Sequence, residues 1–114
     1  MNTEGYVSED FVSTETAKLL LEKGCPDFGY SCIYDDEDNK LQTQAIIMKW
    51  LREVHNQNII FDMLPKGNGC YVLWTFNIIS NKNHKIIWGT KQPKYKTYEE
   101  ACESAIKYCL ENFL

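Results

Sequence analysis

The sequence predicts an α+β fold, in which a three- to four-stranded antiparallel sheet carries its helices mainly on one face. The first observation is the closing stretch "TYEEACESAIKYCLENFL", whose apolar residues recur at helical spacing. The second is a set of three β-rich runs separated by "PKGNG" and "SNKNH", turn sequences that are typical of hairpins. A capped helix precedes these runs. The order from residue 43 onward is therefore α-β-β-β-α, which layers helices on one side of a sheet.

The last helix is predicted to begin near Tyr98. Thr97 and Glu100 form an S/T-x-x-E capping box, in which the threonine hydroxyl accepts from the N3 amide and the glutamate accepts from the N–H of the cap. Apolar residues then follow in one continuous stripe, and we expect this stripe to lie across the sheet and close the core. The stripe comprises Tyr98, Ala101, Cys102, Ala105, Ile106, Cys109, Leu110 and Phe113.

Two earlier helices are predicted from their caps. Ser13 caps a helix over about residues 14–23, and Gly24 supplies its left-handed stop. Thr43 caps a second helix that ends at His55 and Asn56. The residues expected to face inward are Ala17, Leu20 and Leu21 in the first helix, and Ile47, Trp50, Leu51 and Val54 in the second.

Between these helices, "FGYSCIY" predicts an extended segment that is turned by "DDEDNK". Four acids in a row suggest calcium ligands at first sight. An EF-hand loop needs a glutamate at position 12, however, and position 12 counted from Asp35 is Ile46. We therefore expect a solvated turn. The residues predicted to share one side of the extended segment are Phe28, Tyr30, Cys32 and Tyr34.

The three strands of the sheet are predicted at residues 59–64, 70–79 and 85–90. Side chains of the middle strand alternate between the two faces, and one face is more fully apolar than the other. We expect that apolar face to receive the helices. Its residues are Cys70, Val72, Trp74, Phe76 and Ile78.

Length and composition predict a single domain over residues 1–114, located in the cytoplasm. A chain of 114 residues buries enough surface to fold without disulfide staples. Its five cysteines form no C-x-x-C pair and no zinc spacing, which favours reduced thiols. The first residues lack the apolar core of a signal peptide, and no apolar run approaches the length of a membrane span. We therefore expect no membrane association.

Positive charge is concentrated in the middle of the chain. The net charge is −4, yet residues 60–97 hold six lysines and one acid, Asp62. Lysines protect sheet edges and turns from pairing with other chains, and a basic patch also suits a nucleic acid or an acidic protein. Trp88 and Tyr95 add possible stacking surfaces for bases. The candidate contact residues for a nucleic acid or another partner are Lys82, Lys85, Trp88, Lys91, Lys94, Tyr95 and Lys96.

The α-β-β-β-α order of residues 43–114 resembles the double-stranded RNA-binding domain in topology. That family grips phosphates with a helix start of the form K-K-x-A-K, and "TYEEACESA" lies where its final helix begins. With this motif aligned on Ala101, the lysine positions are occupied by Tyr98, Glu99 and Cys102. Acids at this place repel phosphates, so the RNA-binding residues of the family do not carry over.

A second resemblance covers nearly the whole chain. The stretches "FVSTETAKLLLEKG", "KWLREVHN" and "TYEEACESAIKYCLENFL", with a strand-rich middle, are similar to a group of small uncharacterised proteins of gut Bacteroidetes and their phages and prophages. This resemblance implies a cytoplasmic setting and a phage origin. It implies no activity.

The residue pattern contains no signature of catalysis. A cysteine nucleophile needs a histidine base beside it, and the two histidines, His55 and His84, are not near any cysteine in the sequence. No phosphate-binding loop opens a helix, and no spacing suits a metal site. We therefore expect no enzyme activity, no cofactor and no metal. The predicted function is a small non-catalytic module that binds an unknown protein partner or itself, and the alternative is a nucleic-acid-binding module.

Overall fold

The computed structural model describes residues 10–29, 32–69, 71–89 and 94–114. The predictions made for Tyr30, Cys70 and Lys91 lie outside these residues. The elements in chain order are α1 (Thr14–Glu22), β1 (Cys32–Tyr34), β2 (Lys40–Gln42), α2 (Gln44–Val54), β3 (Gln57–Lys66), β4 (Tyr71–Ser80), β5 (Ile86–Gly89) and α3 (Tyr98–Asn112).

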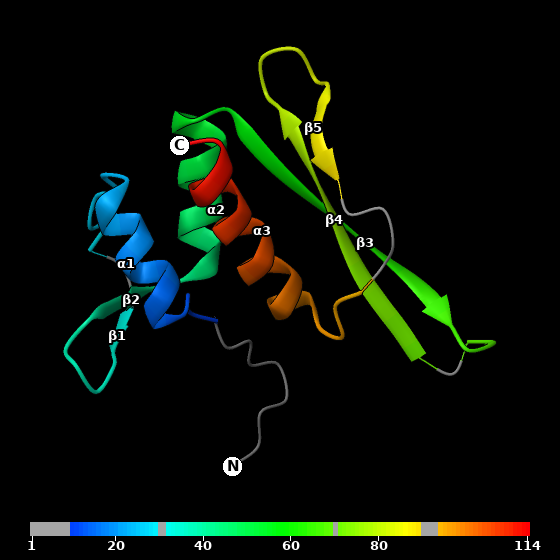
Figure 1. The fold of residues 1–114 in the computed structure, drawn as a ribbon, viewed down its shortest axis with the longest axis horizontal. Helices are drawn as coiled ribbons and strands as arrows, with labels where there is room; N and C mark the ends of the chain where they lie inside the picture. The colour runs from blue at the N-terminus through cyan, green and yellow to red at the C-terminus, as the bar shows by residue number, and fades with distance from the viewer. Residues whose placement is uncertain (1–9, 30–31, 70, 90–93) are drawn as a thin grey trace.

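The structure is an α+β fold layered around helix α3, which confirms the predicted fold class (Figure 1). Strands β3, β4 and β5 form an antiparallel sheet in that order. Helices α2 and α3 pack on one face of this sheet. Helix α1 and the small β1–β2 sheet lie on the other side of α3, so α1 packs against α3 rather than against the larger sheet.

A long hairpin of β3 and β4 dominates the larger sheet. Its strands pair along all ten residues of each, without a register shift. β3 begins at Gln57 and ends at Lys66, so it extends two residues past the predicted range of 59–64 at each end. β5 is shorter, and a bulge interrupts its pairing with β4 between Ile78 and Ile79.

All three helices begin at the predicted caps. The hydroxyls of Ser13, Thr43 and Thr97 accept hydrogen bonds from the backbone N–H three residues on, at 3.2, 3.3 and 3.1 Å. The capping box of α3 differs from the prediction in its second bond. The Glu100 carboxylate accepts from the N–H of Lys96, at 3.2 Å, rather than from the N–H of Thr97. The glutamate therefore fixes the chain one residue before the cap.

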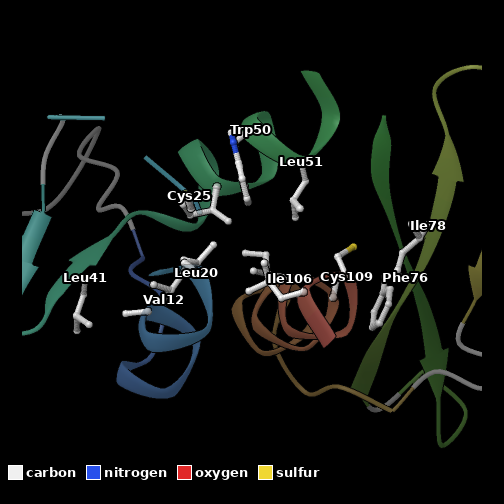
Figure 2. Close-up of a cluster of buried hydrophobic side chains, with 14 residues drawn as sticks. Val12, Leu20, Cys25, Leu41, Trp50, Leu51, Phe76, Ile78, Ile106 and Cys109 are labelled. Carbon is white, nitrogen blue, oxygen red and sulfur yellow. The ribbon is translucent and has the colours of Figure 1, made fainter. Parts of the chain in front are cut away.

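One cluster of buried side chains joins the layers, and α3 lies at its centre (Figure 2). The predicted stripe of α3 is buried except at its ends, where Tyr98 and Phe113 are partly exposed. α3 meets α1 on one side and α2 with the sheet on the other. Small side chains at this helix let its neighbours approach closely. The buried residues of α3 are Ala101, Cys102, Ala105, Ile106, Cys109 and Leu110.

The sheet contributes Phe76 and Ile78 to this cluster, both from the face that was predicted to receive the helices. Trp74, on the same face, is half-buried. Val72 is 43% exposed, because it lies near the start of β4, in the part of the hairpin that extends beyond α3 (Figure 1). The prediction of the helix-facing side is therefore correct, but coverage does not reach the start of the strand.

Two residues that were expected to face inward lie on the surface. Leu21 is 73% exposed and Val54 is 60% exposed. α1 is covered along a narrow stripe that includes Thr16 and Leu20. The next residue, Leu21, is rotated about 100° from Leu20 around the helix axis and therefore leaves this stripe. Val54 is the last residue of α2, where the helix leaves the core.

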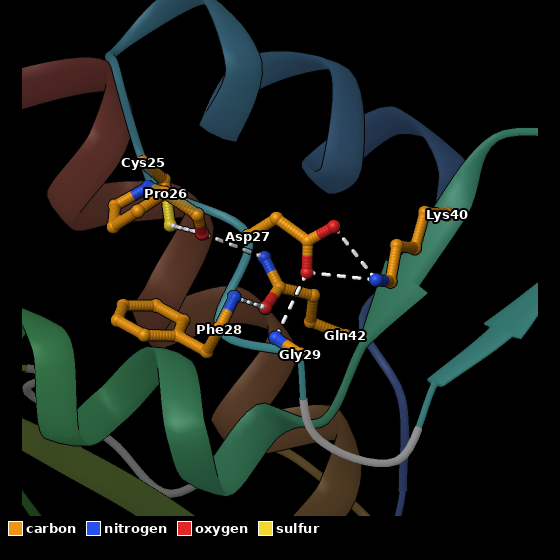
Figure 3. A network of polar contacts seen from close by, with 7 residues as sticks. All are labelled: Cys25, Pro26, Asp27, Phe28, Gly29, Lys40 and Gln42. Atoms are coloured by element: carbon orange, nitrogen blue, oxygen red, sulfur yellow. Dashed lines mark hydrogen bonds and ion pairs between the residues drawn. The ribbon is translucent and has the colours of Figure 1, made fainter.

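Strand β2 was not predicted, and polar side chains hold it in place (Figure 3). The Gln42 amide donates to the carbonyl of Pro26 and accepts from the N–H of Phe28, each at 3.1 Å. The Lys40 ammonium pairs with the Asp27 carboxylate at 2.7 Å. Two alternating side chains of a three-residue strand thus fasten the segment that follows α1.

The acidic turn between β1 and β2 is organised by Asp35. Its Oδ1 accepts from the N–H groups of Glu37 and Asn39, both at 2.9 Å, and its Oδ2 accepts from the Thr14 hydroxyl at 2.6 Å. The other three acids of the turn are exposed, as expected for a solvated turn. Asp35 therefore also ties the hairpin to the first residue of α1.

We expect the Asp35→Asn variant to lose stability at neutral pH but not at strongly acidic pH. The hydrogen bond from Thr14 is the main cause that lowers the pKa of Asp35 to about 2. A carboxylate with a lowered folded-state pKa stabilises the fold above its unfolded pKa of about 4, and this contribution disappears as the pH falls toward 2. Urea midpoints measured from pH 7 to pH 2 test this. Asp36→Asn, an exposed residue of the same turn, is the control and should lower the urea midpoint at pH 7 by less than Asp35→Asn does.

Candidate interaction surface

Four of the five lysines predicted to contact a partner lie among the described residues, where they are exposed and fall into two groups. Lys82 and Lys85 lie in the connection between β4 and β5, whereas Lys94 and Lys96 lie between β5 and α3. The Ser80 N–H donates to the Lys85 carbonyl, and the Lys94 N–H donates to the Trp74 carbonyl. The two groups therefore lie beside positions of β4 that are six residues apart. Six residues of strand span about 20 Å. The four described lysines therefore form two small basic sites.

The aromatic residues predicted as stacking surfaces, Trp88 and Tyr95, are partly buried and contact other rings of the protein. The Trp88 ring stacks on Tyr108 with 4.2 Å between ring centroids, and it lies tilted against the Phe76 ring at 5.2 Å. The Tyr95 ring lies 5.9 Å from Phe76 on one side, and the Lys94 ammonium lies 5.3 Å from it. Tyr108 of α3 thus holds the Trp88 ring against the core.

The surface beside Tyr95 is acidic. A shallow depression of about 490 Å³ lies here, between the start of α1 and the first half of α3. Tyr95 lines it, although lysines flank this residue on both sides. Acids this close to Lys94 and Lys96 weaken the attraction of those lysines for phosphates. The acids that line the depression are Asp10, Glu99, Glu100 and Glu103.

The buried cysteines carry little thiolate, which is the nucleophilic form. Burial raises the pKa of the Cys25 and Cys102 thiols to about 11 and that of Cys109 to about 12. His55 packs edge-on against the Trp50 ring at 4.6 Å. His84 lies in the exposed connection between β4 and β5. The three buried cysteines and His55 therefore lie in packing contacts, and His84 lies in a connection between strands.

Within residues 10–29, 32–69, 71–89 and 94–114, no group of three or more histidine, cysteine, aspartate or glutamate side chains is placed to hold a metal ion. In the same part of the chain, no helix is long and apolar enough to cross a membrane.

The largest concentration of exposed apolar side chains lies on residues 60–66 and 71–73, which we call the distal hairpin. Figure 1 shows these ends of β3 and β4 extending beyond α3. Alternation along the strands places them on both faces of the sheet: Met63 and Val72 lie on the helix side, and Ile60, Leu64 and Tyr71 on the opposite side. These five side chains are 43% to 56% exposed.

The outer edge of β3 presents backbone groups that bond no other described residue. Trp74 donates its N–H to the Tyr95 carbonyl at 2.7 Å and accepts from the Tyr95 N–H at 3.1 Å, so its backbone groups point away from β3. Residues of an antiparallel pair alternate between bonded and non-bonded positions. Met63, opposite Trp74, therefore directs its N–H and C=O outward, as do Phe61 and Ile59.

Sequence reasoning predicted the two strands of this hairpin but not their overhang. Ten residues of strand span about 30 Å, whereas the 15 residues of α3 span about 22 Å. Helix α3 is thus too short to cover the hairpin along its whole length. Comparing these lengths in the sequence was the signal that could have identified the exposed end.

The chain was also compared with known proteins. It matches no family model, no curated protein and no solved structure.

Proposed function

We propose that this protein is a small, non-catalytic protein-interaction module of phage or prophage type that works in the cytoplasm. The distal hairpin is its contact surface. The observation that carries this proposal is the overhang itself: two adjacent strands present apolar side chains on both faces and an unpaired edge among the described residues. The resemblance of the caps and helical stripes to proteins of gut Bacteroidetes and their phages supports the proposed setting.

The composition of the distal hairpin favours a protein partner. Exposed apolar patches on a folded domain mark sites of protein association, and tyrosine and methionine are enriched at the centres of such interfaces. Tyr71 and Met63 are the two most exposed apolar residues of the hairpin. An extended partner segment has access to both the side chains and the outer edge of β3, which is the arrangement used in strand addition.

Nucleic acid is the alternative partner, and the four exposed lysines at positions 82, 85, 94 and 96 are the observation in its favour. Their separation into two groups and the acids beside the second group argue against it. Binding through these lysines would weaken steeply as salt rises, whereas binding through the apolar hairpin would persist.

Site-specific photocrosslinking in cells that encode the protein tests the proposal. A photoreactive phenylalanine analogue replaces Met63 in one variant and Leu21 in the control, since Leu21 is an exposed apolar residue on α1, away from the hairpin. We expect a protein adduct of defined mass from position 63 and none from position 21. Nucleic-acid adducts, or equal protein adducts from both positions, would contradict the proposal. A gel shift with mixed DNA and RNA at low and moderate salt tests the alternative directly.

A further inference from the structure

We infer that the partner at the β3 edge is a second copy of this chain, which pairs its own β3 antiparallel to the first about a two-fold axis at Phe61. The two larger sheets then join into one continuous six-stranded sheet. This inference rests on the proposed function and names the partner of that same surface.

The two edges of the larger sheet differ in how they are protected. Proteins keep edge strands from pairing by making them short, by bulges and by charged side chains. The β5 edge has all three features: the strand is four residues long, a bulge lies opposite Ile78 and Ile79, and Lys85 directly precedes the strand. β3 has ten residues and no bulge, and Asp62 is its only charged side chain before Lys66. The edge that is open to pairing is therefore β3.

Hydrogen bonding is satisfied in this register of the pair. An axis at Phe61 sets Phe61 opposite its own copy and Ile59 opposite Met63 of the second copy, and all of these residues direct N–H and C=O outward. Each of these pairs then exchanges both of its hydrogen bonds. Pro65, which lacks an N–H, falls opposite Gln57 at the end of the ladder, where its missing donor costs least.

Side-chain charge agrees with this register. Asp62 lies opposite Ile60 of the second copy, so no like charges face each other directly. An axis at Asp62 would set this carboxylate opposite itself. An axis at Leu64 would pair Asp62 with Lys66, but it would place Pro65 in the middle of the ladder and end it at Gly67, where φ is 60°. Two exposed ion pairs contribute less than the ladder hydrogen bonds lost in that register.

The apolar side chains of the strand are also self-complementary in this register. On the helix side of the joined sheet, Phe61 meets Phe61 and Ile59 meets Met63 of the second copy. Met63, at 56% exposure, is the member of these pairs with the most apolar surface still to bury. Aromatic and aliphatic cross-strand pairs of this kind stabilise antiparallel sheets.

Sedimentation equilibrium of the purified full chain, with wild type and two variants at Met63, tests the inference. Met63→Pro removes an outward N–H and blocks the edge, yet it removes no hydrogen bond within one copy, because the Met63 N–H does not point to β4. The matched control, Met63→Ala, shortens the side chain and keeps the N–H. We expect a wild-type dimer, a dissociation constant raised at least about 30-fold by Met63→Pro, and less than about 10-fold by Met63→Ala.

Amide hydrogen exchange of the wild-type protein provides a test that needs no variant to fold. In the dimer, the N–H groups of Ile59, Phe61 and Met63 exchange slowly, and dilution below the dissociation constant makes them exchange fast. A chain that is monomeric at all concentrations, or a dimer in which these three amides exchange fast, would overturn the inference. If the chain is monomeric but position 63 still crosslinks to a different protein, the proposed function stands and only the second copy is excluded. If position 63 gives no protein adduct and no dimer forms, both fail.

Discussion

The Ile106→Ala variant should lose about 2–5 kcal/mol of unfolding free energy, the range for truncating a large aliphatic side chain in a core. Ile106 is 0% exposed and lies on α3, where the helix is enclosed by the other layers (Figure 2). The cavity that is left would border elements from different layers, and close packing limits how far they can collapse into it. For a domain of this size, such a loss lowers the melting temperature by several degrees per kcal/mol.

Leu21→Ala is the matched control for this prediction. It removes a large aliphatic side chain from another helix, but Leu21 is 73% exposed, so we expect a change within about 0.5 kcal/mol. Urea unfolding of both variants, with the slope held to the wild-type value, gives the comparison. Similar losses for Ile106→Ala and Leu21→Ala would mean that α3 does not lie at the centre of the fold.

The helix starts were predictable because local chemistry determines them. A cap hydroxyl needs only a hydrogen bond from the backbone N–H of the residue three positions later. Ser13, Thr43 and Thr97 each accept such a bond. The face of α3 was predictable for the same reason, since an apolar stripe at helical spacing needs no knowledge of what covers it. The hairpin turns likewise lie within a few residues of the strands they join.

Contacts between distant segments were not predictable from local patterns. Trp88 has Lys85 and Lys91 as neighbours in sequence, yet its ring is covered by Tyr108 of α3, twenty residues further on. β2 is held by the bonds of Gln42 and Lys40 to the segment after α1. The sequence of three residues alone does not predict these bonds. Sequence order also leaves open on which side of α3 helix α1 packs.

The same limit applies to the candidate surface. The sequence directed attention to lysines, which are conspicuous in composition, whereas the exposed apolar surface arises from how far β3 and β4 extend beyond α3. Met63 and Leu64 read as ordinary strand residues, because alternation assigns each to a face without saying whether that face is covered.

Glu103 of α3 completes the cap of α1 from a distant part of the chain. In a capping box, the residue at N3 is a glutamate or glutamine that accepts from the N–H of the cap. In α1 that position is Thr16, and the Ser13 N–H donates instead to Oε1 of Glu103 at 3.1 Å. Oε2 of Glu103 accepts from the Ser13 hydroxyl at 2.7 Å and from the Thr16 hydroxyl. Beside this cap, the Lys107 ammonium bonds Glu15 at 2.6 Å and adds a second tie between the two helices.

The Glu103→Ala variant should therefore lose about 1.5–3 kcal/mol of unfolding free energy, the range for hydrogen bonds to a charged group. The loss is large for a polar residue because Thr16 is 0% exposed, and its hydroxyl keeps only the Ser13 hydroxyl, at 3.2 Å, as a partner among the described residues once the carboxylate is gone. Glu103→Gln keeps one acceptor oxygen for the Ser13 N–H and should lose about half as much.

Glu111→Ala, which changes an exposed glutamate on the same helix, is the control and should change stability by less than about 0.5 kcal/mol. The Lys107–Glu15 pair is more exposed than Thr16, so its loss in Lys107→Ala should cost less stability than the loss of the Glu103 carboxylate. Urea unfolding should give the largest loss for Glu103→Ala, a smaller loss for Glu103→Gln, and the smallest losses for Lys107→Ala and Glu111→Ala. A loss for Glu103→Ala no greater than that for Glu111→Ala would show that α1 is held by its apolar contacts alone.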